Sequence, residues 1–584
     1  GTKLSVTKYD TVAKGELYGV YTYKDGAVYS SVTYPVLDET NDFKPTSTKY
    51  FLSKTAEPQL GGTYEYTTQY NRDGSVQGEG LPAAADLSGE ALGYVYDDLQ
   101  RPVGLNSSLG GLSYVTDASY SPTSNLEQLE LYTGESTAKK TWITNTFEQG
   151  TDRLTNSRVD VEGASSVAYD ADYTYDASGN VLSIADTPTG GTSDVQCFTY
   201  DGLQRLSDTW TSSVTPNGAS GTGSSEAACS SGASSSTVGG VSPFWTEYGY
   251  DTLGNRKSET RHGLNGAATS TRSYVYGDGS GPNGTDSGPH TVSSVTTKTD
   301  ATATTPQVTS QDTYTYDASG NTATRVLSGD TQSLAWDKQG ELSTVTNADG
   351  TVTSYKYDAS GARLLQDAPT EKTFYLPGME LHYDKSTAKV TATRYYSFGG
   401  ATVAMREADG VHFLVSDHQG TAELAVDAKT GTTTRRRTDP FGNARDESSS
   451  SSTGWVNDKG FVGGTIQAST GLTTLGAREY DADTGRFISA DPIVDYNDPQ
   501  QINGYAYANN SPVSHSDASG LRLADCDGGW NECGPGRAFA AATAKSADTG
   551  SSGTGGDGST DTVDSYAAAI SQYRDVAWER AARL

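Results

Sequence analysis

The chain of 584 residues is too long for one ordinary hydrophobic core, so an internal repeat has to be sought first. Its 42 basic and 72 acidic side chains give a formal net charge of −30 at pH 7, which argues against a nucleic-acid-binding surface because phosphate binding needs clustered cations. The sequence has no run of about 18 apolar residues and no basic-then-apolar start, so neither a membrane span nor a signal peptide is expected. The 37 Tyr and 66 Gly residues favour strands joined by tight turns, and we predict an all-β protein.

The repeated unit is a pair of aromatic residues two positions apart, followed by an aspartate and, three residues later, by a glycine. Aromatic residues at this spacing share one face of a strand. The aspartate opens a turn by accepting hydrogen bonds from the backbone ahead of it, and the glycine takes the positive-φ position, so each copy predicts strand, turn and strand. Copies begin at Tyr94, Tyr173, Phe198, Tyr248, Tyr314 and Tyr355, with an eroded copy at Leu334; the copies at Tyr94 and Phe198 carry glutamine in place of the glycine.

The tyrosines of these copies allow two interpretations. Their aromatic faces suit a sugar-binding wall, but they also suit ladders in which tyrosines of neighbouring hairpins pack on one another. We favour the ladders, and we interpret the aspartates as turn formers rather than as ligands.

Two inserts between the copies, residues 212–240 and 277–290, are of low complexity and cannot bury enough apolar surface to order themselves. Asp278 and Asp286 give the second insert a calcium-binding alternative. Their spacing is not that of a calcium loop, so we favour a solvated loop and expect no metal and no cofactor.

The four cysteines fall into two local pairs, Cys197 with Cys229 and Cys526 with Cys533. Pairing by proximity predicts two disulfides and an oxidising compartment, although four cysteines permit three connectivities. Zinc is the alternative for the second pair, and we disfavour it because six residues separate the cysteines and no histidine is close.

From Phe374 to Leu521 the sequence changes character and presents an ordered series of blocks: FYLPGMELHYD, RYYSFGGATVAMRE, SDHQGT, DPFGN, GAREYDADTGRFISADPI and DASGL. Together with the repeats, these blocks resemble the Rhs and teneurin families over about residues 60 to 521, most specifically after Phe374. In those families the repeats wind one sheet into a spiral that closes as a hollow shell, and the resemblance implies the same fold here. It implies an N-terminal β segment at 1–60, a repeat shell at 61–373, an Rhs core at 374–521 and a variable tail at 522–584.

The resemblance also implies that the core is an aspartic autoprotease that cuts its own chain. The family cuts immediately after a terminal motif that is matched here by DASGL, which places the scissile bond between Leu521 and Arg522. The arginine and the first catalytic aspartate of the family match Arg478 and Asp491, and Asp517 is the expected second carboxylate. Two carboxylates suit this chemistry when one is ionised and the other protonated, and Arg478 would hold one of them ionised.

Several features of this region leave alternatives open. Ala518 stands where the family has proline, which relaxes the backbone beside Asp517 and predicts less efficient cleavage. The less favoured alternative is that Arg478, Asp481 and Asp491 form a buried ion-pair network that closes the shell. Lesser candidates for a catalytic role are Asp481, Asp483 and Asp495; Asp417 with His418, and Ser416, Ser489 and Ser519, lack the setting of a nucleophile and its base.

The tail combines a glycine- and serine-rich linker with a segment whose apolar residues recur at helical spacing between Val563 and Ala577, which predicts one amphipathic helix. The chain starts within its repeat pattern, so we expect it to be a piece of a longer protein. We favour a cargo that continues beyond Leu584, and the alternative is that the tail is only a leader threaded inside the shell. The expected protein is a secreted or cell-surface monomer whose partners are its own C-terminal cargo and an immunity or delivery protein. The alternative is an adhesive, carbohydrate-facing scaffold without protease activity.

Overall fold

The computed structural model describes residues 4–214, 227–277, 288–445, 454–493, 499–521 and 523–525. Its main element is one antiparallel sheet of 33 strands, in which each strand pairs with the next along the chain. The strands are β1 (Ser5–Tyr9), β2 (Leu17–Lys24), β3 (Ala27–Asp38), β4 (Lys44–Leu52), β5 (Gly62–Tyr70), β6 (Val76–Leu81), β7 (Glu90–Tyr96), β8 (Pro102–Ser107), β9 (Ser113–Tyr120), β10 (Leu126–Leu131), β11 (Thr141–Phe147), β12 (Leu154–Val161), β13 (Tyr169–Tyr175), β14 (Val181–Asp186), β15 (Asp194–Tyr200), β16 (Leu206–Ser212), β17 (Trp245–Tyr250), β18 (Arg256–Arg261), β19 (Ser270–Tyr276), β20 (Val292–Thr299), β21 (Val308–Tyr316), β22 (Thr322–Leu327), β23 (Asp330–Trp336), β24 (Leu342–Thr346), β25 (Val352–Tyr357), β26 (Arg363–Asp367), β27 (Glu371–Leu376), β28 (Met379–Asp384), β29 (Lys389–Phe398), β30 (Ala401–Glu407), β31 (Gly410–Ser416), β32 (Ala422–Asp427) and β33 (Thr433–Arg435).

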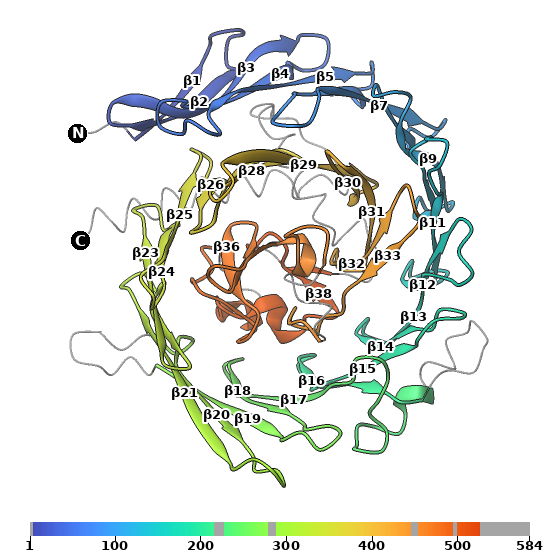
Figure 1. The fold of residues 1–584 in the computed structure, drawn as a ribbon, viewed down its shortest axis with the longest axis vertical. Coiled ribbons are helices and arrows are strands. Elements are labelled where there is room, and N and C mark those ends of the chain that lie inside the picture. The colour runs from blue at the N-terminus through green and yellow to red at the C-terminus, as the bar shows by residue number, and fades with distance from the viewer. Residues whose placement is uncertain are drawn as a thin grey trace, which may run out of the picture.

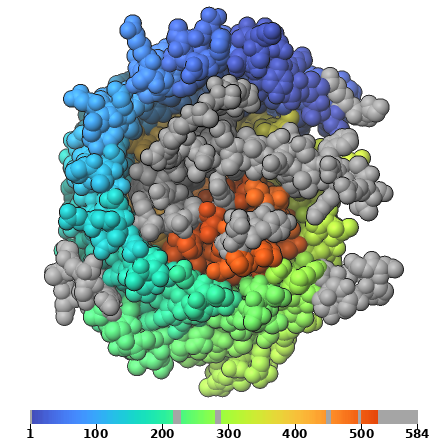
Figure 2. Space-filling view, turned by 180° about the vertical axis from the view of Figure 1, so that it is seen from behind, coloured from blue at the N-terminus to red at the C-terminus, as the bar shows by residue number. Residues whose placement is uncertain are grey.

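The sheet winds as a spiral (Figure 1). Strands β1 to β25 form the outer turn, and β26 to β33 run inside it, facing the first strands of the outer turn. The centre is occupied by the segment after β33, here called the plug and defined as the described residues from 454 to 521. Figure 2 shows the wall of the outer turn around a hollow in which the orange-red residues of the plug lie.

The plug is built from short elements. They are β34 (Thr465–Gln467), β35 (Leu472–Leu475), β36 (Arg478–Asp481) and β37 (Arg486–Phe487), which form a four-stranded sheet, the 3-10 turns η3 (Phe461–Gly463), η4 (Pro499–Ile502) and η5 (Tyr507–Asn510), and β38 (His515–Ser516), which pairs with β39 (Ala524–Asp525). An aromatic cluster packs at the centre of the plug, with Tyr480 in contact with Phe461, Phe487 and Tyr507.

Each repeat forms the predicted hairpin, and its aspartate makes the turn. In the copy at Asp176, Oδ1 accepts the amides of Ser178 and Asn180 at 2.8 and 3.0 Å, and Gly179 has a φ of +96°. The register shifts at the second aromatic residue, Tyr175 in this copy, so that a β-bulge directs its ring toward the preceding strand.

An aromatic residue at the end of nine strands, six of them strands of the repeat copies, links one hairpin to the one before. Its hydroxyl, or the indole N–H of Trp336, donates at 2.6–3.0 Å to a backbone carbonyl near the start of the preceding strand. The donors are Tyr70, Tyr96, Tyr120, Tyr175, Tyr200, Tyr250, Tyr276, Trp336 and Tyr357. These aromatic residues therefore hold successive hairpins together along the spiral.

Tyr250→Phe should lower the free energy of unfolding by about 1–2 kcal/mol, because the carbonyl of Leu206 loses the hydroxyl that donates to it at 2.8 Å. Denaturant unfolding followed by tryptophan fluorescence measures the change. Tyr9→Phe is the control, since Tyr9 is 55% exposed. Equal effects of the two substitutions would contradict the ladder.

The inner and outer turns of the spiral meet at a buried glutamate. Glu90, at the start of β7, accepts hydrogen bonds from Arg394 and Tyr396 of β29 at 2.7 Å each and from Tyr114 of β9 at 2.8 Å. The rings of Tyr114 and Tyr396 stack with centroids 3.7 Å apart. Residues about 300 positions apart in the sequence are thereby held together.

The predicted all-β fold, in which hairpins wind into a spiral shell, is confirmed. The predicted boundaries at residues 60, 373 and 521 stay predictions, and the sheet continues without a break through β27, which contains Phe374. The predicted tail helix lies outside the described residues, and no helix among those that are described is long and apolar enough to cross a membrane.

Candidate active site

Arg478 lies at the start of β36 and is held in a fixed position by the plug. Its guanidinium lies 3.5 Å from the ring centroid of Phe487, and Nη1 donates to the carbonyl of Gly504 at 2.8 Å. Nε donates to the carbonyl of Gly520. The side chain is 4% exposed. A guanidinium fixed by stacking and by two carbonyls is well suited to hold carboxylates in one geometry.

Two carboxylates share one nitrogen of this arginine. Nη2 of Arg478 donates to Oδ2 of Asp491 at 2.8 Å and to Oδ2 of Asp517 at 3.0 Å. The three residues singled out by the sequence are therefore in direct contact. One positive charge faces two carboxylates, so the pair is suited to carry a single proton.

Of the two carboxyl groups, Asp491 is the one that is suited to be protonated. Its amide donates to the carbonyl of Gly504, and its Oδ1 accepts the amide of Ile493, both at 2.8 Å. Burial raises the pKa of Asp491 to about 6, and the neighbouring charge of Asp517 adds to the rise, whereas Arg478 and the Ile493 amide oppose it. A carboxyl group with a pKa near 6 can donate a proton at neutral pH.

Asp517 opens the turn that carries the predicted cleavage motif. Its Oδ1 accepts the amide of Leu521 at 3.0 Å and the hydroxyl of Ser519 at 3.2 Å, and its own amide donates to the hydroxyl of Tyr507 at 3.3 Å. Leu521 is 6% exposed. Arg522, on the other side of the predicted scissile bond, lies outside the described residues.

The turn is anchored on both sides. Ser516 of β38, before the turn, pairs with Ala524 of β39, after it, and Leu523, also after it, packs against the aromatic cluster of the plug. Within it, the carbonyl of Ser519 accepts the amide of Ala477 at 2.9 Å. The chain on either side of the Leu521 carbonyl is thus held against the plug.

Gly476 provides the room for this turn. A Cβ at Gly476 would lie 2.1 Å from the carbonyl oxygen of Ser519, so any side chain there would displace the turn. Its φ of +50° is also one that favours glycine. Gly520 has a φ of +68°, and a Cβ there would lie 2.4 Å from the carbonyl oxygen of Leu475.

Gly476→Ala should slow cleavage by about 100-fold if the bond is cut by this site, because a displacement of about 1 Å is enough for such a loss. The rate is read from the fraction of cut chain in a time course on denaturing gels. Gly471→Ala is the matched control, since Gly471 has a φ of +70° and nothing within 4 Å of its Cβ position. A rate for Gly476→Ala equal to that of the control would show that the close approach of Gly476 to Ser519 does not affect cleavage.

The lesser candidates among the aspartates serve other contacts. Asp481 pairs with Arg325 of β22 at 3.3 Å, and Asp483 pairs with Arg272 of β19 at 2.7 Å and with Arg261 of β18 at 3.4 Å. Asp495 lies outside the described residues. Both described aspartates belong to a turn that docks the plug on the outer turn, and neither contacts Arg478 in the described structure.

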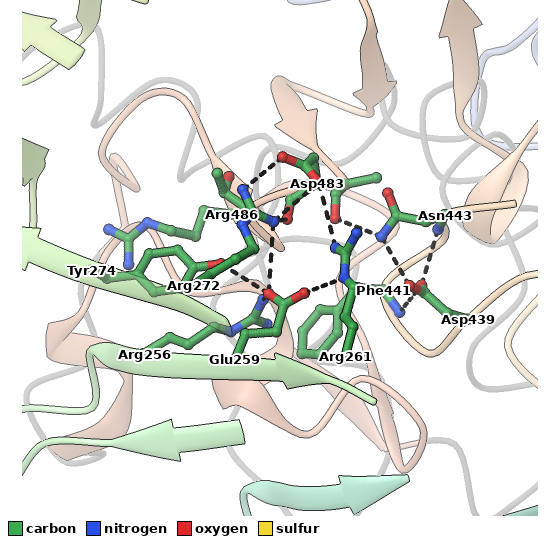
Figure 3. Close-up of polar contacts among 12 residues, drawn as sticks. Arg256, Glu259, Arg261, Arg272, Tyr274, Asp439, Phe441, Asn443, Asp483 and Arg486 are labelled. Atoms are coloured by element: carbon green, nitrogen blue, oxygen red, sulfur yellow. Dashed lines mark hydrogen bonds and ion pairs between the residues drawn. The ribbon is translucent and has the colours of Figure 1, made fainter. Parts of the chain in front are cut away.

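This docking contact is an ion-pair cluster (Figure 3). Glu259 lies beneath it and contacts Arg256 at 3.3 Å, Arg261 at 2.6 Å and the hydroxyl of Tyr274 at 2.8 Å. Asn443 donates to the carbonyl of Ala482 at 3.0 Å, next to Asp483. The cluster fixes the orientation of the plug, and with it the orientation of Arg478 on the same small sheet.

The remaining sequence candidates lie elsewhere. His418 is buried and donates through Nε2 to the carbonyl of Val513 at 2.7 Å, so it anchors the chain between η5 and β38. Ser416 and Ser489 are buried, and Ser519 contacts Asp517 as described. Among the described residues, no group of three His, Cys, Asp or Glu side chains is arranged to hold a metal ion.

Cys197 and Cys229 are joined by a disulfide with a Cα–Cα distance of 5.6 Å. Cys526 and Cys533 lie outside the described residues. The bond ties β15 to the first low-complexity insert, where Ala228 is buried, so the expectation that this insert cannot order itself is wrong for its described residues from 227 onward.

Sequence reasoning missed Tyr507, which holds the Asp517 amide, and Gly476, which admits the turn. Tyr507 was detectable as the second aromatic of a Y-x-Y pair in GYAYANN, the spacing of the repeats. Gly476 precedes Arg478 by two residues, and nothing in its neighbours predicts the contact with Ser519.

Comparison with known proteins identifies the fold and its relatives. The model of the Teneurin YD-shell family matches residues 298–513. The crystal structure of TcdB2-TccC3-TEV matches with a TM-score of 0.58 at 18% identity, covering 89% of this chain and 26% of that chain. The structure of the Photorhabdus luminescens Tc holotoxin pore matches with a TM-score of 0.57 at 18% identity, covering 89% of this chain and 25% of that chain.

The sheet has the fold of a YD-repeat shell and is similar to the Teneurin YD shell. Curated relatives of this YD shell include the tRNA3(Ser)-specific nuclease WapA of Bacillus spizizenii and the tRNA nuclease WapA of Bacillus subtilis strain 168, each 29% identical over 214 residues. These matches cover 35% of this chain and 9% of each relative, so the YD shell described here spans a small part of those proteins and about a quarter of the solved structures.

Proposed function

We propose that this YD shell encloses its own C-terminal segment as cargo and severs it by a single aspartate-dependent cut after Leu521. The observation that carries the proposal is the contact of one arginine nitrogen with both Asp491 and Asp517, beside the turn that ends at Leu521. The cargo belongs to the toxins, as the nuclease names of the relatives suggest, and its further partner is an immunity or delivery protein. The protein acts as a secreted or surface-exposed monomer.

The proposed chemistry follows from the different surroundings of Asp517 and Asp491. Asp517 receives donors from Arg478, the Leu521 amide and the Ser519 hydroxyl, so it is the carboxylate suited to stay ionised and take a proton from water. The water oxygen attacks the carbonyl carbon of Leu521. Asp491 donates its proton to the departing amide nitrogen as the C–N bond breaks, which leaves a carboxyl group on Leu521 and an amine on Arg522.

Proximity explains how a small site can cut once. The reacting bond belongs to the same chain and lies four residues from Asp517, so no substrate has to be bound from solution. The pairing of β38 with β39 and the packing of Leu523 would hold the severed segment in place after the cut. We do not propose that this site cleaves other proteins.

The rate of cleavage should fall with rising pH above about 6. Asp491 must be protonated to act as the acid, and its pKa is about 6, so the protonated fraction drops about tenfold for each further pH unit. Pulse-labelled chain from cell-free synthesis, shifted to buffers between about pH 4.5 and 8.5, gives the profile on denaturing gels. A rate that rises through pH 6 would assign Asp491 to the role of base instead.

The proposal is tested by comparing native and denatured protein. Size-exclusion chromatography under native conditions should give one species that contains both pieces, and a denaturing gel of the same fraction should resolve them. A single full-length chain on the denaturing gel would contradict the proposed cut. A cut chain whose small piece separates under native conditions would contradict enclosure.

A further inference from the structure

The cleavage turn has the geometry of a repeat turn. In each repeat turn the aspartate is the first residue, its Oδ1 accepts the amide of the fifth residue, and its carbonyl accepts the amide of the fourth. Asp517 makes both contacts, with Leu521 at 3.0 Å and with Gly520 at 3.1 Å. The sequences agree as well, because DASGL differs from the DASGN of Asp176 and Asp317 only at the fifth residue.

That fifth residue is where the turns divide. In six turns its side chain donates to Oδ2 of the aspartate at 2.8–3.1 Å and so occupies the second carboxylate oxygen. The pairs are Asp97 with Arg101, Asp176 with Asn180, Asp201 with Arg205, Asp251 with Asn255, Asp317 with Asn321 and Asp439 with Asn443. We call this contact the clamp. In the cleavage turn the fifth residue is leucine, which has no donor, and Oδ2 of Asp517 accepts from Arg478.

A second departure concerns the carbonyl that would be attacked. In nine repeat turns the amide of the aspartate donates to the carbonyl of the fifth residue at 2.8–2.9 Å, as Asp176 does to Asn180. The amide of Asp517 donates instead to the hydroxyl of Tyr507 at 3.3 Å. The carbonyl equivalent to the one that is bound in the repeats is that of Leu521.

We propose that Leu521 is a specificity-determining residue of the cleavage turn because it cannot form the clamp, which leaves Oδ2 of Asp517 to accept from Arg478, the same nitrogen that donates to Asp491. This inference rests on the proposed autoproteolysis and names one of two features that together distinguish the cleavage turn. The Asp358 turn also ends in a residue without a side-chain donor, Ala362, but there the amide of the aspartate donates to the carbonyl of the fifth residue at 2.9 Å. A donor at position 521 would hold Asp517 in its own turn, as Asn180 holds Asp176, and would draw it from Arg478. The turn itself would remain, because its backbone contacts do not depend on the fifth side chain.

Leu521→Asn introduces the clamp in the form used by four repeat turns. It should slow cleavage by about 10- to 100-fold, the range expected for a hydrogen bond to a charged group. The added donor favours the ionised form of Asp517. In a plot of cleavage rate against pH, the acidic limb, where the rate falls as the pH is lowered, should therefore move to lower pH. The residual rate and the profile are measured on pulse-labelled full-length chain from cell-free synthesis.

Two controls separate the clamp from a general effect of a new side chain. Leu521→Met keeps an apolar fifth residue. Leu521→Thr adds a polar group without the clamp, since Thr421, the fifth residue of the Asp417 turn, contacts Asp417 Oδ1 through its backbone amide at 2.8 Å, and its hydroxyl makes no described contact with Oδ2. All three substitutions change the residue at the cleaved bond, so the comparison is made among the variants: Leu521→Asn should be cut at least about tenfold more slowly than either control, the loss expected for one hydrogen bond to a charge.

The outcomes distinguish the inference from the function on which it rests. A parent that is never cut overturns the proposed autoproteolysis. A parent that is cut, with Leu521→Asn as fast as Leu521→Thr, overturns the role of Leu521 and leaves autoproteolysis standing. A slow Leu521→Asn beside fast Leu521→Thr and Leu521→Met, with the shifted acidic limb, supports both.

Discussion

Asp491→Asn should leave the chain uncut while the shell stays folded. Asparagine has the same shape and still offers Arg478 an oxygen, but it has no acidic proton to give to the departing nitrogen. Removal of a general acid costs about 10²- to 10⁴-fold in rate, which turns a complete cut into one that is barely detectable. The measurement is the fraction of cut chain over time, with near-ultraviolet circular dichroism to verify the fold.

Asp349→Asn is the control for this substitution. Asp349 lies in an exposed turn, where its Oδ1 accepts the amide of Thr351 at 2.9 Å, so its loss should not alter cleavage. A folded Asp491→Asn protein that is cut as fast as the parent would exclude Asp491 from the mechanism.

Glu90→Ala should lower the free energy of unfolding by about 3–5 kcal/mol, because it leaves the guanidinium of Arg394 buried without its carboxylate. Arg394 is 1% exposed, and Tyr114 and Tyr396 lose the same acceptor. The change is measured by denaturant unfolding at pH 7. Since this contact joins the inner turn of the spiral to the outer turn, the inner strands should open first, which hydrogen exchange would detect.

The matched control for Glu90→Ala is Glu65→Ala, because Glu65 pairs with Lys49 at 3.4 Å on the surface and is 47% exposed. Its effect should stay within about 0.5 kcal/mol. Equal losses for the two variants would contradict the account of the buried contact.

The contribution of Glu90 should also depend on pH. Burial alone raises the pKa of Glu90, but the hydrogen bonds from Ser107, Tyr396, Tyr114 and Arg394 outweigh it and leave the pKa below its ordinary value. A depressed folded-state pKa means that the stabilisation is present above the ordinary pKa of glutamate and is lost as the pH falls through the folded-state value. Glu90→Gln should therefore flatten the acidic side of the stability profile.

The hairpins of the fold were predictable because their signals are local. The aspartate, the glycine and the aromatic pair of a copy such as Tyr173 to Gly179 lie within seven residues and determine strand, turn and strand by short-range hydrogen bonds. The sheet order followed from these hairpins, since each strand pairs with the next. The β-bulge at the second aromatic residue was not predicted, because it depends on the carbonyl of the neighbouring hairpin.

The contacts that close the spiral could not be predicted from sequence patterns. Glu90 meets Arg394 and Asp483 meets Arg272 across 304 and 211 residues, and no spacing rule connects such positions. The one local hint was a charged residue at the start of a strand with apolar neighbours, GEALGYVY, where a buried charge requires a partner. The partner itself is determined only by the winding of the sheet.

The candidate site was predictable in part, through the resemblance of its blocks to a known family. Arg478, Asp491 and Asp517 meet as expected, although they are 13, 39 and 26 residues apart pairwise. Tyr507 and the close approach of Gly476 to Ser519 depend on how the plug folds back on itself, and so they appear only in three dimensions. The difference between DASGN and DASGL was visible in the sequence, but its meaning depends on where the second carboxylate oxygen points.

The most direct test of the central claim is the intact mass of freshly purified protein under denaturing conditions. The account predicts two polypeptides, one ending at Leu521 and one beginning at Arg522, and a single full-length mass for Asp491→Asn. One uncut mass in both proteins, or a cut at any other bond, would contradict it and leave Arg478, Asp491 and Asp517 as a structural ion-pair network in the plug.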